Sequence, residues 1–413
     1  MTRSMLEVKM RGGAAMQVRA ITVGAEVALT DGTIRLDERL IDFGERARRH
    51  FSAAGLAVQT FRLASQPFPE VVPAEPAAVL ALARGLEQAG METGYEYVSL
   101  GPAGPQQLDW VSPLAQALVA TERVFGTVAV ADQSWGISLP AVVAAASVIR
   151  TLAERTPGGF GNLRFAALAN CPPGIPFFPA GYHRGPQPAF GVAWEAADLA
   201  VEAFTGAGTL AEAETRLLEL VTREARRVAE VASQVAEETG FRFAGIDLSL
   251  APFPEDARSI GEAIERLGVD SFGAPGTLFA AAMITGALQR AEVPKTGFCG
   301  LMLPVLEDSV LGRRAAEGTY AVNDLLLWSA VCGLGLDVVP LPGDVSLDEL
   351  RGLILDVATL AVRLDKPLTA RLMPLPGKRA GDPTDFDFPY FATTVAMPTR
   401  GAGAARLLAR EGL

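Results

Sequence analysis

Short β-type runs alternate with amphipathic helical segments along most of this sequence, and this alternation constrains the fold more than any other feature. A strand-like run at residues 16–27 precedes a helical pattern at 36–55, and a second strand-like run follows at 56–64. Parallel strands need crossover connections, which are usually helices. The pattern therefore predicts an α/β fold of about ten strands, arranged as one wide sheet, a barrel or two half-barrels.

Further strand-like runs continue this alternation to the end of the chain. They lie at residues 95–101, 124–132, 163–170, 241–252, 297–304, 336–341, 368–375 and 390–397. Helical patterns lie between most of them, as expected for repeated βαβ units.

The segment from Ala193 to Thr239 differs, because it is composed almost entirely of helix-forming residues with apolar side chains at helical spacing. We expect a long helix, or a helical hairpin broken near residues 205–209, that packs on the body of the protein or on another subunit. No low-complexity linker divides the chain. We therefore predict one domain over residues 17–413 that includes this helical segment, preceded by a disordered arm at residues 1–16.

Composition argues against several classes of protein. The net charge is −11, and the sequence has no basic stripe, which argues against a nucleic-acid partner. The longest apolar stretches, such as residues 139–149, are much shorter than the roughly 20 residues needed to cross a bilayer. The three cysteines lie far apart without CxxC spacing, which favours a reducing, cytoplasmic location. Alanine-rich, weakly charged helices suggest at least a homodimer.

A rigid Pro-Leu-Pro-Gly corner occurs twice, at residues 340–343 and 374–377. Asp344 follows the first corner and Lys378 follows the second. Between them, Ser346 and Glu349 form a capping box that predicts the start of a helix ending near Leu364. Both corners therefore follow parallel strands, and the carboxyl ends of such strands share one edge of the sheet, where α/β folds bind ligands.

Other predicted strands also end in proline-rich corners with polar side chains, among them His183, Asp256 and Glu307. Proline restricts φ, so these corners should hold polar groups at defined positions. His183 lies in a Gly/Pro-rich loop where it could transfer protons, or it could simply be exposed to solvent.

Polar residues inside apolar strands give a sharper signal. Asp247 and Ser249 share one face of their strand, and Thr369 and Arg371 share one face of another. Buried charges are costly unless they are paired or bound to a ligand. We weigh two interpretations evenly, a structural Asp247–Arg371 ion pair and an arginine that holds a substrate carboxylate or phosphate.

The acids at 307, 308 and 337 are open to more than one interpretation. Glu307 and Asp308 could ligate a divalent cation, or they could be acids of the kind that favour a helix start. Asp337 is either an ordinary loop residue or part of a site. Cys299 and Cys332 are interpreted mainly as small buried apolar residues. The sequence contains no GxGxxG, P-loop, GxSxG or HExxH motif.

Seven segments, taken in order, resemble an uncharacterised bacterial and archaeal family. They lie at residues 95–103, 162–183, 245–254, 272–277, 300–308, 329–344 and 366–382. The family is called domain of unknown function 711, or uncharacterised protein family 0210, and the resemblance covers the chain from about Gln17 onward. It implies a fold similar to the pyruvate formate-lyase-like glycyl radical enzymes, a ten-stranded barrel built from two half-barrels.

The resemblance implies no established activity. Some bacterial members are encoded beside a small ACT-type, amino-acid-binding protein, which suggests such a partner. The Arg-Val-x-Gly-Tyr radical loop of the glycyl radical enzymes is missing from residues 390–413, and adjacent catalytic cysteines are also missing. We therefore expect no radical chemistry.

These observations lead to the hypothesis of an enzyme, such as a hydrolase or lyase, that binds a small anionic metabolite of amino-acid or carboxylate type. A non-catalytic regulatory protein is the alternative. The predicted substrate-binding residues are Arg371, Lys378, Ser249 and Asp344. The predicted acid–base residues are Asp247, Glu307, Asp337 and His183, and a divalent cation would be held by Glu307 and Asp308.

Overall fold

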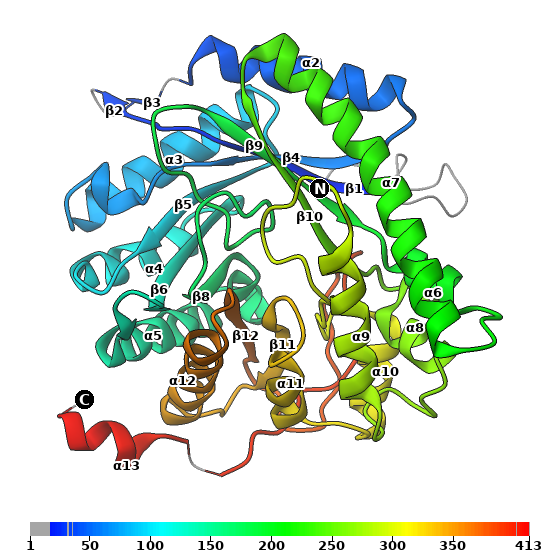
Figure 1. Ribbon diagram of the computed structural model, residues 1–413. Coiled ribbons are helices and arrows are strands. Elements are labelled where there is room, and N and C mark those ends of the chain that lie inside the picture. The colour runs from blue at the N-terminus through cyan, green and yellow to red at the C-terminus, as the bar shows by residue number, and fades with distance from the viewer. Residues whose placement is uncertain (1–16, 31–32, 35, 402, 413) are drawn as a thin grey trace.

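The β-type runs assemble into one ten-stranded mixed sheet in the computed structural model, which describes residues 17–30, 33–34, 36–401 and 403–412 (Figure 1). The predicted disordered arm at residues 1–16 lies outside the described residues. The strands of this sheet are β1 (Gln17–Gly24), β4 (Val58–Ala64), β5 (Tyr97–Ala103), β6 (Val124–Asp132), β7 (Gly136–Ile137), β8 (Phe165–Ala169), β9 (Ala189–Glu195), β10 (Arg242–Ala251), β11 (Gly335–Pro342) and β12 (Leu368–Leu375). A separate small hairpin consists of β2 (Leu29–Thr30) and β3 (Thr33–Ile34). The α/β class and the strand number are confirmed.

The sheet has the order β10-β9-β1-β4-β5-β6-β8-β12-β11, and β7 pairs with β6. The run from β1 through β4, β5 and β6 to β8 is parallel throughout. Its direction reverses at both ends, because β9 is antiparallel to β1 and β12 is antiparallel to β8. The outer pairs, β9 with β10 and β11 with β12, are again parallel.

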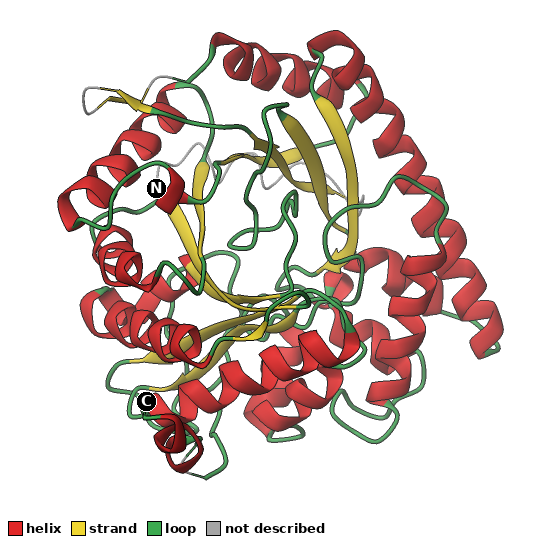
Figure 2. Cartoon of the chain, turned by 60° about the vertical axis from the view of Figure 1, so that its left-hand side comes forward, coloured by secondary structure: helices red, strands yellow, loops and turns green. Residues whose placement is uncertain are grey.

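Helices cover the outside of this sheet, which curves around a set of loops (Figure 2). They are α2 (Glu38–Ala53), α3 (Pro76–Glu92), α4 (Val111–Val119), α5 (Leu139–Arg155), α6 (Ala197–Phe204), α7 (Leu210–Thr239), α8 (Ile260–Arg266), α9 (Thr277–Arg290), α10 (Ser309–Glu317), α11 (Val322–Ser329), α12 (Leu347–Leu364) and α13 (Ala405–Leu408). The large hydrophobic core lies between these helices and the sheet. Among the described residues, no helix has the length and apolar character required to cross a membrane.

Two predicted strands are wrong. Residues 297–304 form no strand, because Gly297 and Cys299 have φ values of 78° and 45°, which extended backbone does not accommodate. This segment makes isolated parallel bridges at its two ends, Lys295 with Ile246 of β10 and Pro304 with Asp337 of β11. Residues 390–397 likewise contain only one bridge, between Val395 and Pro383.

One long strand, β9, was missed, as were the two-residue strands β2, β3 and β7. All seven residues of β9 are buried, so its sequence shows no alternation of polar and apolar positions, and its end lies in the segment assigned to helices. The rest of that segment is confirmed as two helices, α6 and α7, separated at residues 205–209. Helix α7 packs against α2, α6, α9 and β10.

The repeated corners lie side by side, as predicted. β11 and β12 pair in parallel with Pro342 opposite Leu375, and the Gly343 amide donates to the Lys378 carbonyl at 2.9 Å. The capping box is present at the start of α12, where the Glu349 amide donates to Ser346 Oγ and Glu349 Oε2 accepts from the Ser346 amide.

Candidate anion-binding pocket

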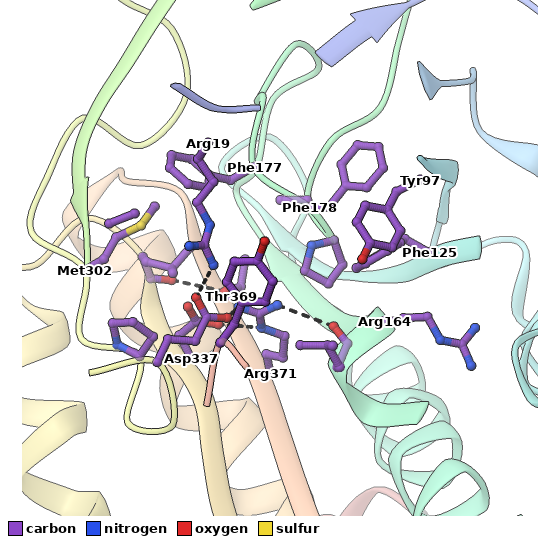
Figure 3. Close-up of a pocket in the computed structure, with 18 of the residues that line it drawn as sticks. Arg19, Tyr97, Phe125, Arg164, Phe177, Phe178, Met302, Asp337, Thr369 and Arg371 are labelled. Carbon is purple, nitrogen blue, oxygen red and sulfur yellow. Dashed lines mark hydrogen bonds and ion pairs between the residues drawn. The ribbon is translucent and has the colours of Figure 1, made fainter. Parts of the chain in front are cut away.

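A pocket opens on the inner side of the sheet, lined by side chains of several strands and loops (Figure 3). Its cavity volume is about 140 Å³, which is enough for a small organic molecule. Side chains come from β1, β4, β5, β6, β11 and β12 and from the loops at residues 177–180, 298–307 and 388–390. The predicted site was the C-terminal edge of the strands, whereas this pocket lies at mid-strand positions such as Asp337 and Arg371.

One side of the pocket is a chain of buried ion pairs. Glu307 accepts from two arginines. The Nη2 of Arg19 lies 2.5 Å from Glu307 Oε2, and the Nη2 of Arg371 lies 3.4 Å from Glu307 Oε1. The Arg371 Nε donates to Asp337 at 2.5 Å, and its Nη1 donates to the Leu163 carbonyl at 3.4 Å. Each of the three guanidinium nitrogens of Arg371 therefore has a protein acceptor.

The chain of ion pairs extends behind Arg19. Arg19 Nη1 lies 3.0 Å from Glu195 Oε2, and Glu195 also pairs with Arg258. Three guanidiniums, those of Arg19, Arg258 and Arg371, are thus matched by three buried carboxylates, those of Glu195, Glu307 and Asp337. Arg258 also pairs at 3.5 Å with Glu255, whose side chain is 58% exposed. We call the six residues other than Glu255 the ion-pair network.

A bulge in β11 positions Asp337. The register between β11 and β12 shifts between Leu336 and Val339, so the bulged strand places an extra residue opposite its partner. Val338 has a φ of 39°, which is unusual for a β-branched residue and is often found near functional sites. Burial raises the pKa of Asp337 although Arg371 opposes the shift. Burial would lower the pKa of Arg371, but Asp337 and Glu307 outweigh it and raise that pKa.

The opposite side of the pocket contains Arg62 of β4, which no carboxylate of the described residues pairs with. Its Nε donates to Thr60 Oγ1 at 3.0 Å, and no acceptor among the described residues bonds to its two terminal nitrogens. Burial, together with nearby Arg19, lowers the pKa of Arg62 to about 10. The side chain therefore still carries its positive charge at neutral pH.

Aromatic rings surround Arg62. Its guanidinium lies 5.4 Å from the ring centre of Phe178 and 5.8 Å from that of Tyr97. Phe125 contacts both rings, with centroid distances of 5.5 Å to Tyr97 and 5.2 Å to Phe178. In Figure 3 these three rings lie to one side of the cavity, and Asp337 and Arg371 lie on the other. We call Tyr97, Phe125 and Phe178 the aromatic wall.

The segment at residues 385–391 contributes the remaining side of the pocket through Phe388 and Tyr390. The Arg19 guanidinium lies 5.6 Å from the centre of the Tyr390 ring. Burial raises the pKa of Tyr390, and Arg19 opposes this shift. A phenol with a raised pKa stays protonated at neutral pH.

Three predicted site residues, Glu307, Asp337 and Arg371, come together in this pocket. Asp247 and Ser249 lie outside its lining. The fully buried Asp247 carboxylate accepts from the amides of Phe298 and Cys299, at 2.7 and 3.0 Å, and from Ser249. The proposed Asp247–Arg371 ion pair is therefore wrong, because backbone amides satisfy Asp247 and the neighbouring strand supplies the partner of Arg371. Asp247 instead holds the loop from which Phe298 lines the pocket.

Asp344 and Lys378 also lie outside the lining. Asp344 is exposed, and Lys378 Nζ pairs at 3.0 Å with Asp385, whose side chain is 78% exposed. The corners do meet, but the structure does not gather their charges with those of Glu307 and Arg371.

His183 lies in a second, smaller cavity of about 60 Å³. Its Nε2 lies 2.6 Å from the Gly185 carbonyl, and its ring packs so closely on Gly24 that a Cβ there would lie 2.6 Å from Nδ1. Burial lowers the pKa of His183. His183 is therefore a buried side chain, not an exposed one, and it does not line the larger pocket.

Glu307 and Asp308 have different partners. The buried Asp308 carboxylate caps α10 by accepting from the Val310 and Leu311 amides, and it also accepts from Ser259 and Ile260. The helix-start interpretation is thus confirmed for Asp308. Within the described ranges, no group of three His, Cys, Asp or Glu side chains is arranged to hold a metal ion.

The cysteines do not resemble activated nucleophiles. Burial raises the pKa of Cys171 and of Cys299 to about 12, so both thiols stay protonated at neutral pH. Cys332 is buried, as predicted.

Sequence reasoning missed Arg19, Arg62, Glu195 and Tyr390. Arg19 and Arg62 carried the signal that identified Arg371, an arginine inside a predicted strand. Glu195 and Tyr390 carried no such signal, because one lies in the missed strand and the other in an irregular segment.

Comparisons with known proteins agree with the resemblance described above. The family model for "Uncharacterised ACR (DUF711)" matches residues 9–388. A UPF0210 protein of Pyrobaculum arsenaticum is 33% identical, over 96% of this chain and 93% of its own. A UPF0210 protein of Desulforudis audaxviator is 32% identical, over 98% and 95%, and one of Methanopyrus kandleri is 33% identical, over 74% and 70%.

Proposed function

The chain belongs to the family described as Uncharacterised ACR (DUF711), and because that description assigns no chemistry, we propose from the pocket that this protein is an enzyme acting on a small anionic metabolite. The observation that carries the proposal is Arg62, a charged and half-buried arginine that faces the cavity without a carboxylate partner among the described residues. Burying an unpaired charge is costly. A ligand anion would offset that cost.

The acid–base groups would be Glu307 and Asp337. Burial raises the pKa of Asp337, and a raised pKa is the direction that favours a carboxyl group in proton transfer. A divalent cation at Glu307 stays a prediction from the sequence.

A thermal-shift screen of small carboxylates, phosphates and divalent metal ions, followed by product analysis, tests the proposal. We expect stabilisation by at least one class of organic anion, its loss in Arg62→Met, and turnover of that anion. Turnover that does not depend on Arg62 would contradict the proposal. The finding that no anion stabilises the protein would also contradict it.

A regulatory protein that binds the same anion without turnover is the second candidate. It is favoured by the fact that Glu195, Glu307 and Asp337 are already paired with arginines, which lowers their availability as bases. The ACT-type partner that the resemblance implies would then receive the signal. Stabilisation without product, and co-purification of such a partner, would favour this candidate.

We also propose that the sheet closes as two half-barrels. The parallel run from β1 to β8 would form one half, and β9, β10, β11 and β12 would belong to the other. Support comes from residues 295–304, which bridge to edge strand β10 at one end and to edge strand β11 at the other. A cytoplasmic location and assembly into at least a dimer stay predictions.

A further inference from the structure

We infer that the ligand of this pocket is a monocarboxylate with an apolar, preferably aromatic body and no ammonium group. This inference rests on the proposed function, since it assumes that Arg62 binds the ligand's anion. It goes further by excluding free amino acids and dicarboxylates as preferred ligands.

The charge balance of the pocket sets the ligand's charge. The ion-pair network is neutral when its three guanidiniums and three carboxylates are ionised. The remaining carboxylate of the lining, Glu122, is exposed and interacts with Arg164, whose guanidinium points away from Arg19 and Asp337 (Figure 3). Arg62 therefore leaves one positive charge to be matched, which favours a ligand with a single negative charge.

The free donors of Arg62 favour a carboxylate. Its Nε is occupied by Thr60, whereas both terminal nitrogens lack acceptors among the described residues. The planar pair of terminal N–H groups matches the two oxygens of a carboxylate in a bidentate arrangement. Thr60 thus fixes the orientation of the guanidinium and leaves its other edge toward the cavity.

The surroundings of Arg62 favour an apolar ligand body. The aromatic wall lies directly beside the guanidinium. Beyond it, the lining includes the apolar side chains of Phe177, Phe298, Met302 and Leu334. Flat apolar groups pack well against such rings in offset or edge-to-face arrangements.

An ammonium group fits this arrangement less well than an apolar body does. Glu307 and Asp337 each accept from a guanidinium already, so an ammonium bound there would share its carboxylate with Arg19 or Arg371. It would also lie among the positive charges of Arg19, Arg62 and Arg371. Specificity would come from this repulsion as well as from the attraction of Arg62 for the carboxylate.

Four probes that share the 3-phenylpropanoyl skeleton test the inference by calorimetric titration of the full chain. They are 3-phenylpropanoate, phenylalanine, benzylmalonate and 3-phenylpropanamide, which present one anion, a zwitterion, a dianion and a neutral group. We expect 3-phenylpropanoate to bind at least tenfold more tightly than each of the others. Butanoate, which lacks the ring, should bind at least tenfold more weakly.

Three variants keep the result interpretable. Arg62→Met should abolish binding of 3-phenylpropanoate, and Arg62→Lys, which keeps the charge but not the planar fork, should weaken it. Phe178→Leu should weaken the binding of 3-phenylpropanoate more than the binding of butanoate. Circular dichroism and thermal unfolding confirm that each variant is folded.

The possible results separate this inference from the proposed function. Equal or tighter binding of phenylalanine, benzylmalonate or butanoate that still depends on Arg62 would overturn the inference and leave the proposed function intact. Binding that does not depend on Arg62, or no binding of any of the five probes, would also overturn it. The broader anion screen would then decide whether the proposed function stands.

Discussion

Arg62 and Arg371 both lie inside strands and line the same pocket, yet their surroundings differ. Arg371 has protein acceptors on all three nitrogens, from Asp337, Glu307 and Leu163. Arg62 has a hydroxyl on one nitrogen and aromatic rings around the rest. A buried charge with a protein acceptor on every nitrogen has a structural role. A buried charge without such acceptors lowers the stability of the folded protein and indicates that a ligand binds there.

The largest expected effect is on stability, from Arg371→Met. It would leave Asp337 without its cation and remove one of the two partners of Glu307, so we expect unfolding free energy to fall by about 3 to 5 kcal/mol. Urea denaturation monitored by circular dichroism measures the loss. Arg62→Met is the matched control, because it removes an equally large charge, and we expect its stability to be unchanged or higher by about 1 kcal/mol. Equal losses of unfolding free energy in both variants would show that the two arginines contribute alike to stability, which would contradict this prediction.

The next effect is on ligand binding, from the same Arg62→Met variant. A charge-assisted, bidentate contact contributes about 1.5 to 3 kcal/mol, so affinity for the preferred carboxylate should fall by roughly 10- to 100-fold. Titration calorimetry measures the change. A loss below threefold would show that Arg62 is not the anion-binding group.

A smaller effect is expected from pH. Arg62 has a lowered pKa of about 10, so it loses its proton as pH rises through this value, whereas the raised pKa of Arg371 keeps that side chain charged. Affinity for a carboxylate should therefore stay constant from about pH 7 to 9 and fall above about 10. A lowered pKa in the folded protein means that folding favours the neutral form of Arg62. Deprotonation of Arg62 should therefore not destabilise the folded protein. Affinity that is unchanged at pH 10.5, in a folded protein, would argue against this assignment.

The smallest effect is expected at the corner predicted from the sequence. Lys378→Ala removes a pair whose carboxylate partner is largely exposed, and such pairs contribute about 0 to 1 kcal/mol. We expect little change in unfolding free energy and none in carboxylate affinity. A loss of affinity comparable to that of Arg62→Met would indicate that the ligand binds at the edge of the sheet.

Local patterns predicted much of the fold and only part of the site. The capping box at Ser346, the parallel corners and helix α7 depend on near neighbours in the chain, and all were predicted. The alternation around Arg371 correctly marked a charge facing inward. The alternation could not identify Asp337 and Glu307 as the partners of Arg371. These contacts depend on the bulge in β11 and on a turn 64 residues from Arg371 in the sequence. Asp247 was misassigned for the same reason, since its amide donors lie in a loop whose positive φ values were not visible in the pattern.

Glu307 has a consequence for the shape of the pocket. It contacts Arg19 of β1 and Arg371 of β12, although β4, β5, β6 and β8 lie between these strands in the sheet. One side chain therefore ties together two distant strands and sets the spacing between them. The size of molecule that the cavity admits is thus determined in part by the length of a single glutamate, and its replacement by a shorter acid is a direct way to alter selectivity.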